Sequence, residues 1–149
     1  MMKKLAFLFL IVLIFETNSF SQGRNAVGLR ISSNYDLGDL GLTFKHRFKV
    51  NTTIEGIANF NNSFSSITGL LEKYKSLTST TRLQFLYGGG AYVGFGGATR
   101  AGIAGILGLC YNFKDIPFDL SIDWMPTCQI VNDVHPYFNS LGLSIRFKF

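Results

Sequence analysis

The sequence has little of what small catalytic and metal-binding sites usually require. It contains two cysteines, two histidines and three prolines, and 15% of its residues are charged. The cysteines and histidines are too dispersed for a zinc site. The glycine-rich stretch 88–97 contains no G-x-x-x-x-G-K-[ST] pattern, and no G-x-G-x-x-G opens a helix there. We therefore expect no cofactor and no metal, and we interpret these glycines as room inside a crowded fold.

The chain also lacks an apolar run long enough to cross a bilayer as a helix. The amino-terminal run Leu5–Phe15 has about half of the roughly 20 residues that such a helix needs. It follows Lys3 and Lys4 and precedes Ser19-Phe20-Ser21, which places small residues at both key positions of a cleavage site. This pattern predicts a cleavable signal peptide at residues 1–21 and one exported domain at residues 22–149.

A concentrated positive charge is missing as well. The formal net charge is +5, and the basic residues Lys3 and Lys4 leave with the predicted signal peptide. The remaining basic residues are distributed singly along the sequence, whereas a nucleic-acid-binding protein gathers them in a patch or along one helix face. We therefore expect no nucleic-acid partner.

The two cysteines, Cys110 and Cys128, are not expected to form a disulfide, although an exported protein meets an oxidising compartment. A hairpin that turns near Lys114 places Cys110 opposite Asp119, roughly nine residues or about 30 Å from Cys128 at ~3.3 Å per residue. A disulfide requires Cα atoms within ~7 Å of each other. We predict two free, buried thiols on opposite faces of their strands.

What the sequence has in abundance is the alternation of apolar and polar residues. It is clearest at the carboxy terminus, where Leu141, Leu143, Ile145, Phe147 and Phe149 alternate with small, polar or charged residues. A period of two indicates a strand with one apolar and one polar face. Eight such segments fill the chain: 25–32, 40–48, 52–60, 66–74, 82–95, 101–113, 116–126 and 138–149. The alternation does not assign the two faces of segment 66–74.

The polar faces carry small residues and a few charges, which suits a narrow interior better than a solvated surface. The opposite faces are bulky and carry aromatic residues that are typical of the girdles of membrane barrels: Phe44, Phe60, Phe95, Phe113, Trp124 and Phe149. With this parity six charged residues point inward, where they form either a structural ion-pair network or the lining of a narrow conduit: Arg30, Lys45, Glu55, Asp119, Asp123 and Arg146. Because lipid cannot satisfy an open sheet edge, we predict an all-β fold, a closed eight-stranded antiparallel up-and-down transmembrane β-barrel.

The stretches Tyr87–Phe95, Gly105–Leu109 and Asp123–Pro126, with the terminal segment Leu143–Phe149, resemble uncharacterised members of the small eight-stranded outer-membrane barrels of diderm bacteria. The resemblance covers nearly the whole exported domain. It implies a location in the outer membrane, contact with outer-membrane lipid, and recognition of the terminal Phe149 by the barrel-assembly machinery. It implies an architecture and no particular activity or oligomeric state. The connections are shorter here than the extracellular loops usual in this group, which argues against adhesion or receptor roles carried by loops.

Two other functions stay open at this stage. Some eight-stranded outer-membrane barrels are lipid A deacylases, and His135, Ser140 and Asp133 offer the residue types of a hydrolase. The sequence lacks the close His-x-Ser-Asn run of those enzymes, and a five-residue offset along a strand rarely gives hydrogen-bond reach. A secreted calycin-like barrel would instead turn the bulky faces inward around an apolar ligand. We expect a structural or interaction role without turnover.

Overall fold

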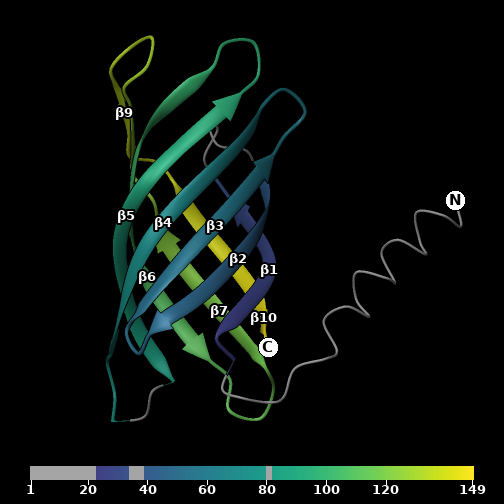
Figure 1. Cartoon of the computed structure of the whole chain (residues 1–149), viewed down its shortest axis with the longest axis vertical. Coiled ribbons are helices and arrows are strands. Elements are labelled where there is room, and N and C mark those ends of the chain that lie inside the picture. Colours follow the sequence, from purple (N-terminus) through teal and green to yellow (C-terminus); the bar gives the residue numbers. More distant parts are fainter. Residues whose placement is uncertain (1–22, 34–38, 80–81) are drawn as a thin grey trace, which may run out of the picture.

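Ten antiparallel strands form one sheet that closes into an eight-stranded barrel (Figure 1). The computed structural model describes residues 23–33, 39–79 and 82–149, so the predicted signal peptide at 1–21 lies outside the described residues. The strands are β1 (Asn25–Ser32), β2 (Leu40–Lys49), β3 (Thr52–Phe60), β4 (Ser65–Ser76), β5 (Leu83–Phe95), β6 (Arg100–Asn112), β7 (Phe118–Trp124), β8 (Thr127–Gln129), β9 (His135–Tyr137) and β10 (Leu141–Lys148). The prediction of an all-β closed barrel with eight strands is confirmed.

Ten strands occupy eight positions because the last two positions are each divided in two. β6 pairs with β7 from Leu107 to Asn112 and with β8 from Gly102 to Ala104, in one continuous register. The break lies at Met125 and Pro126, where proline has no N–H to contribute to the sheet. In the last position, β9 and β10 are separated by residues 138–140. Their pairing with β8 and β7 shifts by one residue across this segment, as at a β-bulge.

The barrel closes where the first strand meets the last. β1 and β10 are paired without interruption from Ala26 opposite Lys148 to Ser32 opposite Gly142. Beyond β10, Asn25 and Phe149 exchange two backbone hydrogen bonds of 3.1 and 2.9 Å. The chain therefore leaves no free edge between its two ends, and the predicted aromatic terminus is part of this seam.

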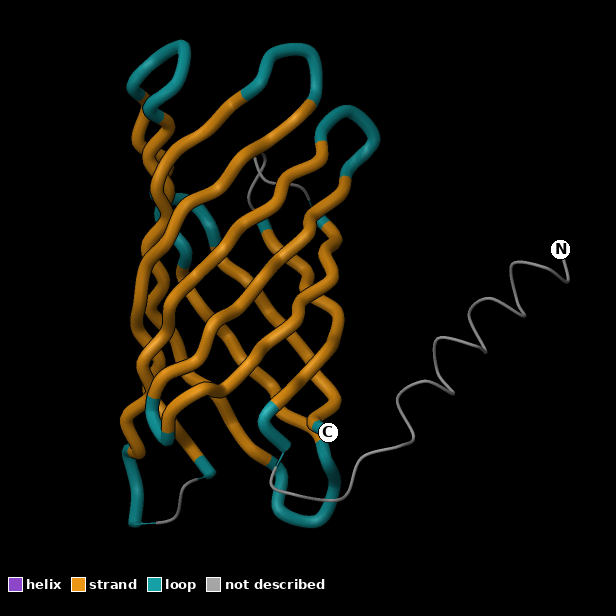
Figure 2. The backbone as a smooth tube through the Cα atoms, in the orientation of Figure 1, coloured by secondary structure: helices purple, strands orange, loops and turns teal. Residues whose placement is uncertain are grey.

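The connections between the strands lie alternately at the two ends of the barrel (Figure 2). At one end, which we call the turn end, lie the start of β1, the end of β10, the connections 50–51 and 113–117, and residues 77–79 and 82 between β4 and β5. At the other, the loop end, lie the connections 61–64, 96–99 and 130–134. Between β1 and β2, residues 34–38 lie outside the described residues.

The strands place their bulky apolar side chains outside and their small or charged side chains inside. Leu29, Leu42, Ile67 and Ile145 are 49–58% exposed, and their pairing partners on neighbouring strands continue the same apolar face. The intervening residues, such as Arg30 at 0% and Arg146 at 1% exposure, are buried. The described residues include no helix that is long and apolar enough to cross a membrane.

Candidate functional site

The interior of the barrel is the candidate site, and it has two chemically different sides. One side, which we call the ionic side, carries the buried charged residues of β1, β2, β3, β7 and β10 and extends to β4. The apolar side is a cluster of buried residues drawn mainly from β4, β5 and β6. The six charged residues predicted to point inward all lie on the ionic side, and each of them forms an ion pair.

The first unit of the ionic side joins β1 to β7. The Arg30 guanidinium donates to both carboxylate oxygens of Asp123, at 2.7 and 2.5 Å, and to the Ser144 hydroxyl at 3.3 Å. Both charged side chains are fully buried. A two-pronged bond of this kind fixes direction as well as distance, because the planar guanidinium matches the carboxylate in only a few orientations. The pair spans β10, which lies between the two strands.

Arg146 on β10 is the centre of a second unit, which reaches strands on both sides of the seam. Its guanidinium donates to Asp119 at 3.0 Å and to Ser121 at 2.8 Å on β7, and to Glu55 at 2.8 Å on β3. Its Nε also donates to the Thr43 hydroxyl on β2 at 3.2 Å. The Thr43 hydroxyl in turn donates to Glu55. One buried cation thus links β2, β3, β7 and β10 across the barrel interior.

The third unit adds a carboxyl group that the sequence did not reveal. Lys45 lies 3.4 Å from Glu55 and 2.9 Å from Glu72 on β4, and its ammonium group also donates to the Tyr74 hydroxyl. Tyr74 donates to Glu72 at 2.7 Å. Glu72 could not be placed because β4 carries a charge on each face, Glu72 inside and Lys73 outside. Glu72 is paired with Thr53, which faces inward because the next residue, Ile54, faces outward. Knowledge of this pairing would have shown that Glu72 also faces inward.

Small residues make the space that the ionic side needs. A Cβ atom at Gly142 would overlap the Arg30 guanidinium, and one at Gly28 would overlap the backbone of Ile145 and Arg146. Gly142 therefore makes room for the Arg30 side chain, and Gly28 allows the backbone of β10 to approach closely. The prediction that small residues on the polar faces make room for interior charges agrees with this geometry.

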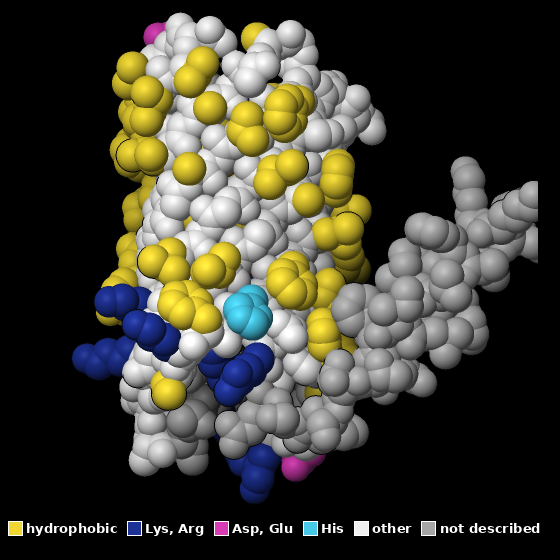
Figure 3. Space-filling view, viewed as in Figure 1, with side chains coloured by type: hydrophobic (Ala, Val, Ile, Leu, Met, Phe, Trp, Pro, Cys, Tyr) yellow, Lys and Arg dark blue, Asp and Glu magenta, His cyan; other side chains and the backbone are white. Residues whose placement is uncertain are grey.

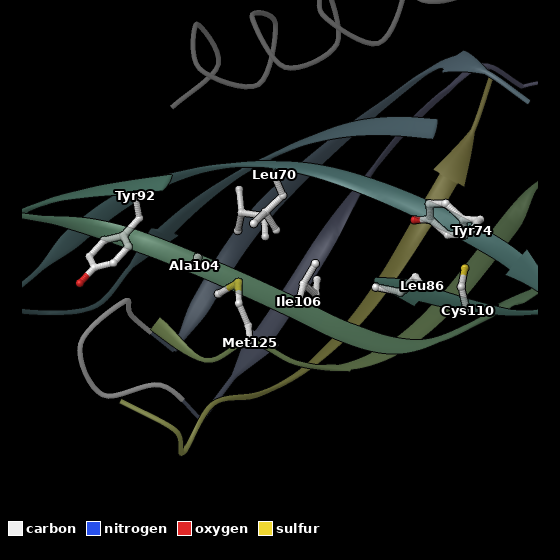
Figure 4. Close-up of a cluster of buried hydrophobic side chains, with 9 residues drawn as sticks. Leu70, Tyr74, Leu86, Tyr92, Ala104, Ile106, Cys110 and Met125 are labelled. Atoms are coloured by element: carbon white, nitrogen blue, oxygen red, sulfur yellow. The ribbon is translucent and has the colours of Figure 1, made fainter. Parts of the chain in front are cut away.

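The apolar side was missed by the sequence analysis. Ile57, Leu70, Leu86, Ile106 and Met125 are each at most 2% exposed and lie together inside the barrel (Figure 4). Strand parity alone contains the signal, because Ile106 is two residues from the inward-facing Ala104 and Leu86 is two residues from Gly88. One side of the interior is therefore apolar, whereas we had expected a polar interior throughout.

Both ends of the interior are narrow. At the loop end the buried Phe64 ring packs against Gly94, and the Arg100 guanidinium lies 5.2 Å from the ring centre. At the turn end a cavity of about 30 Å³ is lined by residues that include Lys45, Tyr74 and Asp119. Such a volume holds one or two water molecules. The packed charges of the ionic side lie between these two ends.

The residues of the hydrolase alternative are not brought together. His135 and Asp133 are exposed and lie 3.5 Å apart in the ion-pair geometry, whereas Ser140 is fully buried and its hydroxyl has no hydrogen bond to His135. The two thiols are free, as predicted. Cys110 is buried inside the barrel, but Cys128 is only half-buried, so the prediction of two buried thiols was wrong for Cys128. No metal-binding group of three or more His, Cys, Asp or Glu residues is found among the described residues.

The aromatic residues singled out in the sequence lie on the outside of the barrel. Phe44, Phe60, Phe95, Phe113 and Trp124 are all more than a third exposed, and Phe149 is half-buried with its ring stacked on Phe147. Near the turn end, rings on neighbouring strands also pack against each other, as Phe118 does against Phe147 at 5.5 Å between ring centres.

The basic residues are distributed singly along the sequence, but in the structure the exposed ones gather at one end of the barrel. Figure 3 shows the Lys and Arg side chains of this face gathered toward the turn end. The exposed basic residues at that end are Arg24, Arg47, Lys49, Lys73, Lys75, Arg82 and Lys114. Among the described residues, exposed acidic side chains are Asp115 at the same end and Asp39 and Asp133 at the loop end. This uneven distribution of charge is not visible in the sequence, because every second connection of an antiparallel barrel lies at the same end and the residues of one end are therefore spread along the chain.

Comparisons of the chain with protein-family models, with curated proteins and with solved structures found no match.

Proposed function

We propose that this chain is an integral outer-membrane β-barrel protein of a diderm bacterium, exported by a signal peptide at residues 1–21. Its wall faces lipid, its interior is plugged by packed side chains, and its role is structural or interactive without turnover. In this proposal both termini lie in the periplasm, together with the turn end. The carboxy-terminal Phe149 serves as a signal for the barrel-assembly machinery.

One observation carries the proposal, namely that the outer wall is apolar on every side. Ile31, Ile54, Ile103, Ile122 and Leu143 are 48–61% exposed and come from β1, β3, β6, β7 and β10. A water-soluble monomer rarely exposes apolar patches beyond a few hundred Å². In the strands of the described chain, charged Lys or Arg side chains at outward positions occur near the turn end only, at Lys49, Lys73 and Lys75. Closure of the sheet supports the same location, because lipid cannot hydrogen-bond to a free edge.

The first experiment is heat-modifiable gel migration of the outer-membrane fraction. A folded membrane barrel resists the detergent of the gel until it is boiled, so unboiled and boiled samples migrate differently. The mature chain is expected to begin at Gln22 and to be found in this fraction, which intact mass measurement and fractionation check. Recovery of the protein in the aqueous phase without detergent would support the secreted calycin-like alternative and refute the proposal.

A pair of substitutions tests contact with lipid directly. Ile145 is 49% exposed in the middle of β10, and Val50 is 87% exposed in the turn between β2 and β3. In a bilayer, Ile145→Arg is expected to lower the free energy of unfolding by about 2–4 kcal/mol, whereas Val50→Arg is expected to change it by ~0–1 kcal/mol. Urea titration of the protein folded in lipid vesicles measures both. In water two exposed arginines would be tolerated alike, so equal small effects would contradict the membrane location.

A further inference from the structure

Three lysines interrupt the apolar outer wall near the turn end, and we call them the lysine patch: Lys49, Lys73 and Lys75. Lys73 and Lys75 follow Leu71 in the outward positions of β4. Lys49 reaches the same face because the pairing of β2 and β3 shifts between Arg47 and Lys49, which places Lys49 opposite Thr52. Thr52 lies between Lys49 and Lys73 in the sheet. Two strand spacings put these lysine backbones about 10 Å apart, close enough for both side chains to reach one phosphate group.

The lysine patch has no ion-pair partner among residues 23–33, 39–79 and 82–149. All three lysines are exposed, and none of the ion pairs of the described residues involves them. The neighbouring acidic side chains, Glu55 and Glu72, point inward and are bound by Arg146 and Lys45. The lysines therefore present unneutralised charge to whatever surrounds this part of the wall.

Aromatic neighbours indicate what surrounds the patch. Lys73 is paired with Tyr87 and Lys75 with Phe85 on β5, and these two rings stack with their centres 6.0 Å apart. Aromatic side chains at the rim of a membrane barrel lie at the level of the lipid headgroups. On the opposite side of the barrel, the outward positions near the turn end carry Tyr111, Phe118 and Phe147 without a lysine. Among the described strands, lysines at outward positions near the turn end thus occur only on β2 and β4.

We propose that the lysine patch binds the phosphate of acidic phospholipids in the leaflet at the turn end, which is the periplasmic leaflet if the proposed function is right. Charge complementarity carries this assignment, because three unpaired ammonium groups at headgroup level attract anionic headgroups. The barrel then has a preferred side for acidic lipid, along β2–β4.

The test compares lipids at the surface of the purified protein in phosphatidylcholine bilayers. Trace amounts of spin-labelled phosphatidylglycerol, phosphatidylcholine or lipid A are added, and electron paramagnetic resonance gives the relative association constant of each lipid. The wild-type protein is expected to select phosphatidylglycerol over phosphatidylcholine by about fivefold or more, since one lysine near a charged surface contributes roughly this factor. The triple variant Lys49→Gln, Lys73→Gln, Lys75→Gln is expected to reduce the selection to within about twofold of unity.

A matched control separates the patch from the general positive charge of the turn end. Lys114→Gln removes one positive charge in the connection between β6 and β7, away from β2–β4, and is expected to leave the selectivity within about twofold of wild type. The single variant Lys73→Gln is expected to lose more selectivity than Lys114→Gln. Equal losses in these two variants would overturn the assignment to the patch.

The remaining outcomes are also decisive. Equal association of phosphatidylglycerol and phosphatidylcholine with the wild-type protein would overturn the inference and leave the membrane proposal intact. Selection of lipid A over phosphatidylglycerol that disappears in the triple variant would overturn the assignment to a phospholipid leaflet. Failure of the wild-type protein to enter phosphatidylcholine bilayers at all would overturn both this inference and the proposed function.

Discussion

The two sides of the barrel interior join different parts of the chain. On the ionic side, Arg30 and Asp123 are 93 residues apart in sequence, and Arg146 and Glu55 are 91 apart. The apolar side lies on β4, β5 and β6, which follow one another through the connections 77–82 and 96–99. The pairs of Arg30 with Asp123 and of Arg146 with Glu55 therefore hold strands that are distant in sequence, whereas most of the apolar packing fills the space between strands that are already neighbours.

This difference indicates what each side contributes to folding. Neighbouring strands of a hairpin are aligned by their connection, so an apolar filling without directional bonds is sufficient there. The seam between β1 and β10 has no connection to align it, and a slip of one residue would turn Arg30 and Arg146 outward. The directional bonds of these arginines favour one register over its neighbours. The predictions below test whether the two sides differ in this way.

The largest effect is expected from Arg146→Met. The substitution leaves Asp119 buried without its cation and Glu55 with Lys45 alone, and removing one partner of a buried ion pair costs about 3–5 kcal/mol. Urea titration of the protein in lipid vesicles, followed by heat-modifiable migration, measures the loss. Ile145→Met on the same strand is the matched control because its side chain points outward, and it is expected to change stability by less than ~1 kcal/mol.

The effect of an unpaired buried charge can be separated from the effect of lost packing at a second ion pair, Arg30 with Asp123, by removing both partners. The double variant Arg30→Met, Asp123→Leu is expected to be more stable than Arg30→Met alone, because it leaves no buried charge unpaired. A double variant that is the less stable of the two would show that the arginine stem, rather than its charge, matters at the seam.

The fold could be predicted because alternation of apolar and polar residues is a strong signal in a two-faced wall. Segments 25–32 and 52–60 match β1 and β3 at both ends. The breaks in the last two positions were not predicted, although the alternation stops within both segments, at Trp124-Met125 in 116–126 and at Asn139-Ser140 in 138–149. Pairing register, which alternation does not specify, determines where Pro126 interrupts one strand and where the bulge at 138–140 interrupts the next.

The six predicted interior charges were found at the candidate site because they share a strand face with small or polar residues, and four of them, Arg30, Asp119, Asp123 and Arg146, lie directly between two outward apolar residues. Their partners were harder to assign, since one inward face offers several acids to each arginine. Glu72 escaped because Lys73 follows it and both faces of β4 then carry charge. Leu86 and Ile106 were not predicted because the many glycines of β5 and β6 indicated an inward face of small residues, and these two large residues share that face.

An intermediate effect is expected from Gly142→Ala. A Cβ atom at this position would overlap the Arg30 guanidinium, so the ion pair with Asp123 must shift, and overpacking of this kind costs about 1–3 kcal/mol. At Gly56, which faces outward, an added Cβ meets nothing within 4 Å, so Gly56→Ala is the matched control. It is expected to be neutral or to stabilise by up to ~1 kcal/mol. Equal unfolding midpoints in urea for the two variants would contradict the close fit around Arg30.

The smallest effect is expected from Leu86→Met on the apolar side, and it completes the comparison. Methionine keeps the volume and the apolar character, and volume-conserving swaps in a core cost less than about 1.5 kcal/mol. Arg146→Lys is the equivalent conservative change on the ionic side. A single ammonium group cannot reproduce the fork that reaches Glu55 and Asp119 together, so this variant is expected to lose more stability than Leu86→Met. The two variants are compared by their unfolding midpoints in urea in the same vesicles. A larger loss for Leu86→Met would mean that the barrel depends more on the shape of its apolar side than on the direction of its ion pairs.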